Sequence, residues 1–219
     1  MNKWLSMLAG AAALFALPAS AALIGSINSG PGGGMVATEQ WANGGASLSW
    51  EVYQTPDNLW HYDYDWEGDI KALSHIIIGV SLTFTESNIF PGTTTPHELN
   101  TFGSQGNSNP GIPGPLYGIK FDTSNDPTEF DFSIVSDRAP TWVDMYAKDG
   151  VNGGPSNPVY AHNASFGNCL SNQTPATGSV FGCILGPDTR TDIPEPLSLA
   201  LLGFGAAGLM AVRCRRQRA

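Results

Sequence analysis

The sequence is poor in charge, and poorest in positive charge. Only 13% of its 219 residues are charged, about half the share found in an average globular protein. Ten Lys and Arg residues stand against 19 Asp and Glu residues, which gives a net charge of -9 at pH 7. Nucleic-acid binding requires clustered positive charge, so we expect no nucleic-acid partner.

Other shortages narrow the choice of protein class. With 26 Gly and 16 Pro residues, the folded part of the chain has little room for long helices. The sequence contains no Gly-x-Ser-x-Gly elbow, no HExxH pair and no P-loop, which are patterns typical of hydrolases and nucleotide-binding enzymes. We therefore predict no catalytic residues, no enzymatic activity and no required cofactor. A hydrophobic content of 42% is nevertheless too high for a disordered chain.

The N-terminus has the pattern of a secretory signal peptide. Lys3 provides the positive start, and the apolar run Leu5 to Leu17 follows it. Pro18 then breaks the helix before the small residues Ala19, Ser20 and Ala21. A core this short does not span a bilayer, which needs roughly 20 residues. We predict removal of residues 1–21 by signal peptidase.

The C-terminus has an apolar stretch followed by positive charge. Residues 197–212 carry no charge and, as a helix, cover about 24 Å. This is slightly less than the hydrocarbon core of a membrane, and snorkelling arginines make up the difference. The positive-inside rule then places residues 213–219 in the cytoplasm as a basic tail. Its anchoring side chains are Arg213, Arg215, Arg216 and Arg218.

Pro194, Glu195 and Pro196 lie in a linker that we place at residues 188–196. The flanking prolines keep this segment extended. Together with the apolar helix and the arginines, the motif resembles a PEP-CTERM sorting signal. The resemblance covers residues 193–218 and implies an exported bacterial protein, held first in the inner membrane. It also implies recognition and processing of the Pro-Glu-Pro region by the membrane enzyme exosortase, but says nothing about the activity of the body.

Residues 22–187 form the exported part, and their patterns predict strands. Alternating runs at 47–55 and 59–66 flank a Thr-Pro-Asp-Asn turn and indicate a hairpin. The apolar run at 73–84 is typical of a strand buried on both faces. Further strands are expected at residues 116–121, 129–135, 141–147, 159–162 and 179–185. We predict an all-β fold, namely an antiparallel β-sandwich or a jelly-roll-like domain.

Two loops and one cysteine pair add detail to this domain. Residues 25–34 are glycine-rich, and residues 100–115 form a long polar segment with four Gly and three Pro. Long ordered loops often carry binding sites, although a plain surface loop explains the same sequence. Cys169 and Cys183 lie 14 positions apart, and export favours a disulfide between them.

The run from Trp60 to Asp69 alternates aromatic and acidic side chains. Trp60, Tyr62, Tyr64 and Trp66 point one way, either as the core face of a hairpin or as a stacking platform for sugar rings. The acids Asp63, Asp65, Glu67 and Asp69 resemble the start of a calcium loop. Ser74 stands where such a loop needs its last Glu, so a solvent-facing strand is the simpler explanation and a calcium site the weaker hypothesis.

These observations favour a non-enzymatic protein of the cell surface or extracellular matrix, sorted by exosortase. A carbohydrate-binding adhesin, acting with or without calcium on an exopolysaccharide, is the alternative. A secreted hydrolase that uses a carboxylate pair among the acids is the third and weakest hypothesis.

Overall fold

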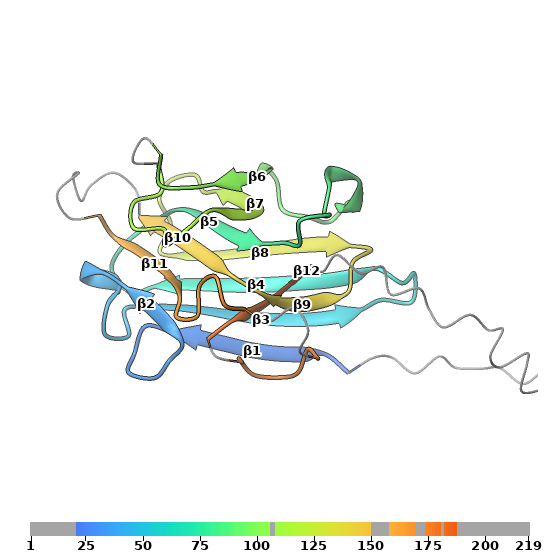
Figure 1. The fold of residues 1–219 in the computed structure, drawn as a ribbon, viewed down its shortest axis with the longest axis horizontal. Coiled ribbons are helices and arrows are strands. Elements are labelled where there is room, and N and C mark those ends of the chain that lie inside the picture. Colours follow the sequence, from blue (N-terminus) through green and yellow to red (C-terminus); the bar gives the residue numbers. More distant parts are fainter. Residues whose placement is uncertain (1–20, 106–107, 150–157, 170–173, 181, 188–219) are drawn as a thin grey trace, which may run out of the picture.

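The computed structural model of the protein describes residues 21–105, 108–149, 158–169, 174–180 and 182–187. These residues form antiparallel strands arranged as two facing sheets and a two-stranded ribbon (Figure 1). Besides the strands they contain two short 3-10 turns, η1 (Glu39–Trp41) and η2 (Glu86–Asn88). The prediction of an all-β, antiparallel fold is confirmed.

The first sheet has four strands in the order β1-β3-β4-β8. Their bounds are β1 Leu23–Asn28, β3 Ala46–Gln54, β4 Trp60–Gly68 and β8 Glu129–Ser136. The predicted hairpin is present as β3 and β4, with Val52 opposite Tyr62 and Leu48 opposite Trp66. The turn between them closes through the Asn58 N–H, which donates to the Thr55 carbonyl oxygen at 2.9 Å.

The second sheet has six strands in the order β2-β11-β10-β5-β7-β6. Their bounds are β2 Met35–Ala37, β5 Leu73–Gly79, β6 His97–Phe102, β7 Leu116–Asp122, β10 Met145–Asp149 and β11 Tyr160–Asn163. The strand β5 lies in the middle, and its residues from His75 to Gly79 are all buried. This confirms the prediction of a central strand covered on both faces.

The main core lies between the two sheets. Inward side chains of the first sheet, such as Trp66 and Phe132, share one hydrophobic cluster with Ile76 and Phe121 of the second. The rings of Phe121 and Phe132 meet across the interface with centroids 4.9 Å apart. Burial of such large rings is the main favourable contribution to folding and holds the sheets face to face.

The outer face of the second sheet carries a smaller core of its own. Ile77 of β5, Leu116 of β7 and Tyr146 of β10 point outward and are buried together with Phe102 and Ile112. Ile112 belongs to the segment 103–115, whose described residues 103–105 and 108–115 cover part of the sheet. The Tyr146 hydroxyl donates to the Pro110 carbonyl oxygen at 2.7 Å and fixes the segment in place.

Several predicted strand boundaries were wrong. The run 141–147 is two strands, because β9 (Pro140–Val143) pairs with β12 (Ile184–Pro187) while β10 pairs with β5. Asp144 separates them, and the chain changes sheet there. The strand at 73–84 ends at Gly79, and the one at 179–185 begins only at Ile184.

Three short strands of the structure were not predicted from the sequence. β1 includes part of the glycine-rich segment 25–34, β2 follows that segment directly, and β6 includes the first residues of the segment 100–115. Residues 1–20 and 188–219 lie outside the described ranges, together with the predicted signal peptide, linker, transmembrane helix and basic tail. Within the described ranges, no helix is long and apolar enough to cross a membrane.

Candidate functional site

The aromatic stripe of β4 faces the core. Tyr62, Tyr64 and Trp66 are at most 2% exposed, and Trp66 makes an edge-to-face contact with Trp41 at 4.9 Å between centroids. The Tyr64 hydroxyl donates to the Leu185 carbonyl oxygen at 2.7 Å. Trp60 is half-buried and packs against the same cluster. These contacts agree with the core-face interpretation and leave no exposed stacking face on the three buried rings.

The acidic residues of the same strand lie on the outer face of the first sheet. Pairing places Asp63 opposite Glu51, Asp65 opposite Asp131, and Glu67 opposite Glu129. Burial raises the pKa of the Asp65 carboxyl, and the neighbouring carboxylates of Asp131 and Glu67 raise it further. Like charges directly opposite one another are destabilising in a sheet. The face is therefore strongly acidic and is expected to repel polyanions.

A groove of about 510 Å³ crosses this acidic face. Asp63 and Asp65 line it together with Thr94 and Ser133, whose hydroxyl donates to Asp63 at 2.7 Å. Asp69 is not part of the groove and lies in the turn after β4. In the described part of the chain, no three His, Cys, Asp or Glu side chains are grouped closely enough to hold a metal ion.

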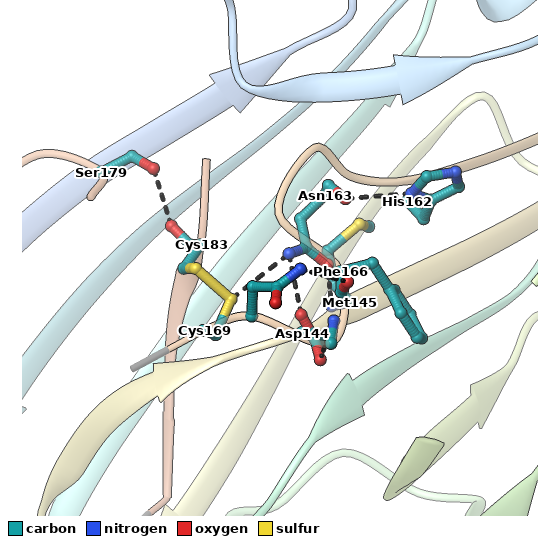
Figure 2. Close-up of a disulfide and its surroundings, with 10 residues drawn as sticks. Asp144, Met145, His162, Asn163, Phe166, Cys169, Ser179 and Cys183 are labelled. Atoms are coloured by element: carbon teal, nitrogen blue, oxygen red, sulfur yellow. Dashed lines mark hydrogen bonds between the residues drawn. A yellow bond between two sulfur atoms is a disulfide. The ribbon is translucent and has the colours of Figure 1, made fainter. Parts of the chain in front are cut away.

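The predicted disulfide between Cys169 and Cys183 is present (Figure 2). It joins the segment after β11 to the start of β12. Beside it, the fully buried Asn163 donates from Nδ2 to Asp144 Oδ1 at 2.9 Å and to Cys169 Sγ at 3.3 Å. The Asn163 Oδ1 atom accepts the Met145 N–H at 2.9 Å. This network fixes the point at which the chain passes from β9 to β10.

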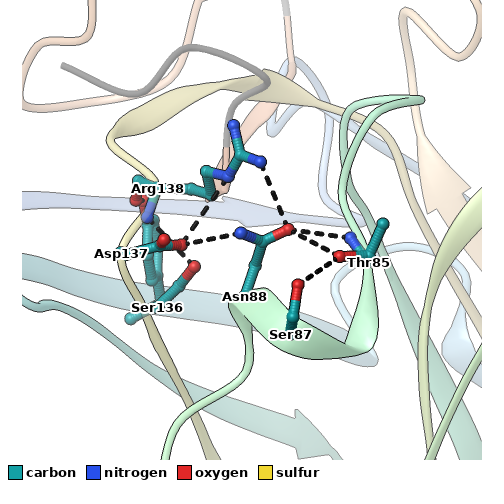
Figure 3. A network of polar contacts seen from close by, with 7 residues as sticks. Thr85, Ser87, Asn88, Ser136, Asp137 and Arg138 are labelled. Atoms are coloured by element: carbon teal, nitrogen blue, oxygen red, sulfur yellow. Dashed lines mark hydrogen bonds and ion pairs between the residues drawn. The ribbon is translucent and has the colours of Figure 1, made fainter. Parts of the chain in front are cut away.

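A second polar network holds the connection between β5 and β6 (Figure 3). The buried Asn88 donates from Nδ2 to Asp137 Oδ1 at 2.9 Å, and its Oδ1 accepts the Thr85 N–H at 2.9 Å. Arg138 donates from Nη2 to the same Asn88 oxygen at 3.3 Å. The network ties η2 to the turn between β8 and β9, which is a structural role.

The segment 103–115 bounds a separate cavity of about 590 Å³ at the outer face of the second sheet. Strands β5, β6 and β7 supply one wall, and the segment supplies the other. The residues lining it are His75, Glu98, Asn100, Thr101, Phe102, Gly103, Gln105, Ser108, Asn109, Pro115 and Lys120. Most of them carry hydrogen-bonding side chains, which sets this cavity apart from the apolar core beside it.

Two buried side chains join the walls of the cavity. His75 Nε2 lies 2.8 Å from Asn109 Oδ1, and both residues are at most 7% exposed. The Asn109 Nδ2 group donates to the Gly103 carbonyl oxygen at 3.1 Å, so its oxygen faces the imidazole. Burial lowers the pKa of His75, and the neutral ring therefore donates from Nε2 and keeps Nδ1 as an acceptor.

The charges at the cavity are paired. Lys120 Nζ lies 3.1 Å from both Glu98 and Asp122, and 5.7 Å from the centroid of the Phe102 ring. Burial lowers the pKa of Lys120, but its hydrogen bonds to the two carboxylates raise it by more. The hydrogen bonds from Asn100 and Lys120 in turn lower the pKa of Glu98. The lysine therefore stays charged, with its charge already compensated.

The sequence indicated the long segment but not these partners. His75 lies in an apolar strand, and Lys120 lies in another strand 45 positions away. Only the pairing of β5 with β7 brings them to one face, with His75 opposite Asp122 and Ile77 opposite Lys120. The alternation of polar residues in β7 was the feature of the sequence that could have indicated this polar face.

A short stretch near the C-terminus matches a known sorting signal. A family model described as the PEP-CTERM protein-sorting motif matches residues 192–216. The chain carries a PEP-CTERM sorting motif. The match includes Pro194, Glu195 and Pro196, which lie outside the described residues, and it implies an exported protein sorted by exosortase. No curated protein and no solved structure matches the chain significantly.

Proposed function

We propose that this PEP-CTERM protein is a non-catalytic component of the cell surface or extracellular matrix. The sorting motif at residues 192–216 carries the proposal, because it implies export. The disulfide supports it, since such bonds persist in oxidising compartments. The acidic face supports it as well, because a face that repels polyanions stays hydrated among acidic polysaccharides.

Two partners follow from the ends of the chain. Signal peptidase removes residues 1–21, and the helix at 197–212 holds the precursor in the inner membrane with its four arginines in the cytoplasm. Exosortase then acts on Pro194-Glu195-Pro196, and the folded body is released or transferred to the surface.

Fractionation combined with intact-mass measurement, in cells with and without exosortase, tests this proposal. Deletion of residues 197–219 is expected to move the protein from the membrane fraction to the periplasm or medium. Replacement of residues 194–196 by alanine is the matched variant, because it keeps the helix and the arginines. That variant is expected to remain in the membrane as an unprocessed precursor.

Two results would contradict the proposal. The first is membrane fractionation that does not change when residues 197–219 are removed. The second is that the protein isolated from its native cells is found in the cytosol with Met1 and Ala219 both still present. Turnover of polysaccharide or ester substrates by the purified protein would instead favour a secreted hydrolase.

A carbohydrate-binding adhesin is the second candidate function. The cavity beside the segment 103–115 favours it, since its walls offer amide, hydroxyl and imidazole groups at one place. The buried aromatic stripe cannot serve as the binding surface while β4 stays in the sheet. Glycan-array binding by the exported protein tests this candidate, and the absence of binding to any glycan would remove it.

A further inference from the structure

The charge balance of the cavity of about 590 Å³ beside the segment 103–115 limits the ligands that fit it. Lys120 is the cation in its wall, and two carboxylates already pair with that ammonium at 3.1 Å. An anionic ligand would be repelled by these two carboxylates, and an organic cation would have to compete with the ammonium for them. A metal ion needs several grouped ligands, and none are grouped in this way among the described residues. A neutral ligand therefore fits best.

The wall supplies hydrogen bonds of both kinds to such a ligand. Asn100, Gln105 and Ser108 are exposed at the rim, and each side chain can donate and accept. Asn109 and His75 lie deeper and are held rigidly by their mutual hydrogen bond. Rigid polar groups hold a ligand in one orientation at a small entropic cost. A ligand with many hydroxyl groups satisfies a wall of this kind.

Apolar surface completes the wall. Pro115 is exposed at the rim, and the Phe102 ring lies below the ammonium of Lys120. A sugar ring has both properties that the cavity selects, namely hydroxyl groups around its edge and apolar C–H faces. The volume also lies within the range of about 300–1,000 Å³ that is usual for small-ligand sites.

We infer that this cavity binds a neutral sugar, as a monosaccharide or as a short unit of a polysaccharide. The inference rests on the carbohydrate-binding candidate described above and names its site and ligand class. The acidic groove on the other sheet is not part of this site.

A matched set of sugars tests the ligand class. D-glucose, D-glucuronate and D-glucosamine share one ring and differ in charge, and D-galactose, D-mannose and N-acetyl-D-glucosamine extend the neutral set. The purified full chain, in a detergent without a sugar head group, is titrated with each sugar by saturation-transfer NMR and calorimetry. We expect binding of at least one neutral sugar, and weaker binding of the glucuronate and the glucosamine.

Two serines of the same segment provide matched variants. Ser108 lines the cavity, whereas Ser104 is equally exposed on the segment but does not line it. Ser108→Trp is expected to weaken sugar binding by about tenfold or more, equivalent to about 1.4 kcal/mol. Ser104→Trp is expected to leave binding unchanged. If Ser108→Trp lowers the Tm, the smaller change Gln105→Ala replaces it and is expected to weaken binding as well.

Each outcome has a definite meaning. Loss of binding in Ser108→Trp but not in Ser104→Trp supports the site. Full binding by Ser108→Trp at an unchanged Tm overturns the site but leaves the adhesin candidate standing. Stronger binding of the charged sugars overturns the ligand class, and binding of no sugar overturns the inference. None of these results affects the sorting proposal, which is tested by fractionation.

Discussion

Removal of the disulfide is the perturbation whose size follows most directly from the structure. The bond between Cys169 and Cys183 closes a loop with a sequence separation of 14. The chain-entropy model assigns about 3 kcal/mol to a loop of this length. For a domain of this size, each kcal/mol shifts the Tm by about 2–4 °C. The variant Cys169→Ala/Cys183→Ala is therefore expected to melt about 6–12 °C below the wild type.

The neighbouring polar network should not add to this loss. Asn163 keeps its hydrogen bonds to Asp144 and to the Met145 N–H when Sγ is removed, so no buried amide group loses all its partners. The loss of stability is therefore expected to come from the cross-link itself. Cys183 is 2% exposed, and alanine at this position leaves only a small cavity.

Thermal unfolding followed by circular dichroism, with and without reductant, measures the effect. Reductant is expected to lower the Tm of the wild type to that of the double variant and to have no effect on the variant. An unchanged Tm in the double variant would refute the reasoning. If the double variant has a lower Tm but reductant does not change the Tm of the wild type, the loss of stability comes from the packing of the two side chains instead.

Three further changes test the core and the acidic face. Trp66→Ala is expected to lower the free energy of unfolding by about 3–5 kcal/mol. Trp60→Ala should lower it by less, because Trp60 is only half-buried. Equal losses for the two variants in urea unfolding would contradict this difference in burial. Tyr64→Phe removes the buried hydrogen bond to the Leu185 carbonyl oxygen and should lower the free energy of unfolding by about 0.5–1.5 kcal/mol in the same assay. The pKa of Asp65 is raised by burial and by its neighbours, so its ionised form destabilises the fold, and stability falls as the pH rises from its usual pKa through the raised value. Asp65→Asn should therefore raise the Tm at pH 7, and the gain should vanish below about pH 3, where both side chains are neutral. A gain that persists there would exclude charge as the cause.

The sequence predicted the bounds most closely for the hairpin strands β3 and β4, whose two faces differ in polarity. In β3 and β4, apolar and polar residues alternate along almost the whole strand, because one face packs on the core and the other meets water. A one-residue shift would expose every aromatic side chain of β4, so the pattern determines the register as well. The turn at residues 55–58 then fixes which strands pair.

The misplaced boundaries come from tertiary contacts that no local pattern contains. Residues 141–147 read as one strand, since apolar residues continue on both sides of Asp144. In the structure, buried Asn163 binds Asp144 and the Met145 N–H, and the chain leaves one pairing for another at this point. The short strands β1, β2 and β6 were missed for a related reason. Their conformation depends on the longer neighbours with which they pair.

The sorting motif and the cavity differ in the same way. The sorting motif is contiguous in the sequence, so residues 192–216 alone suffice for a family model to recognise it. The cavity is assembled from His75, Glu98, Ser108 and Lys120, which come from three strands and the long segment. Their positions become related only when β6, β7 and β5 pair side by side. The sorting motif does not depend on the fold of the domain that precedes it, whereas the cavity exists only in this fold. A change in the sorting motif is therefore expected to leave the cavity intact, and a change in the cavity to leave the sorting motif intact.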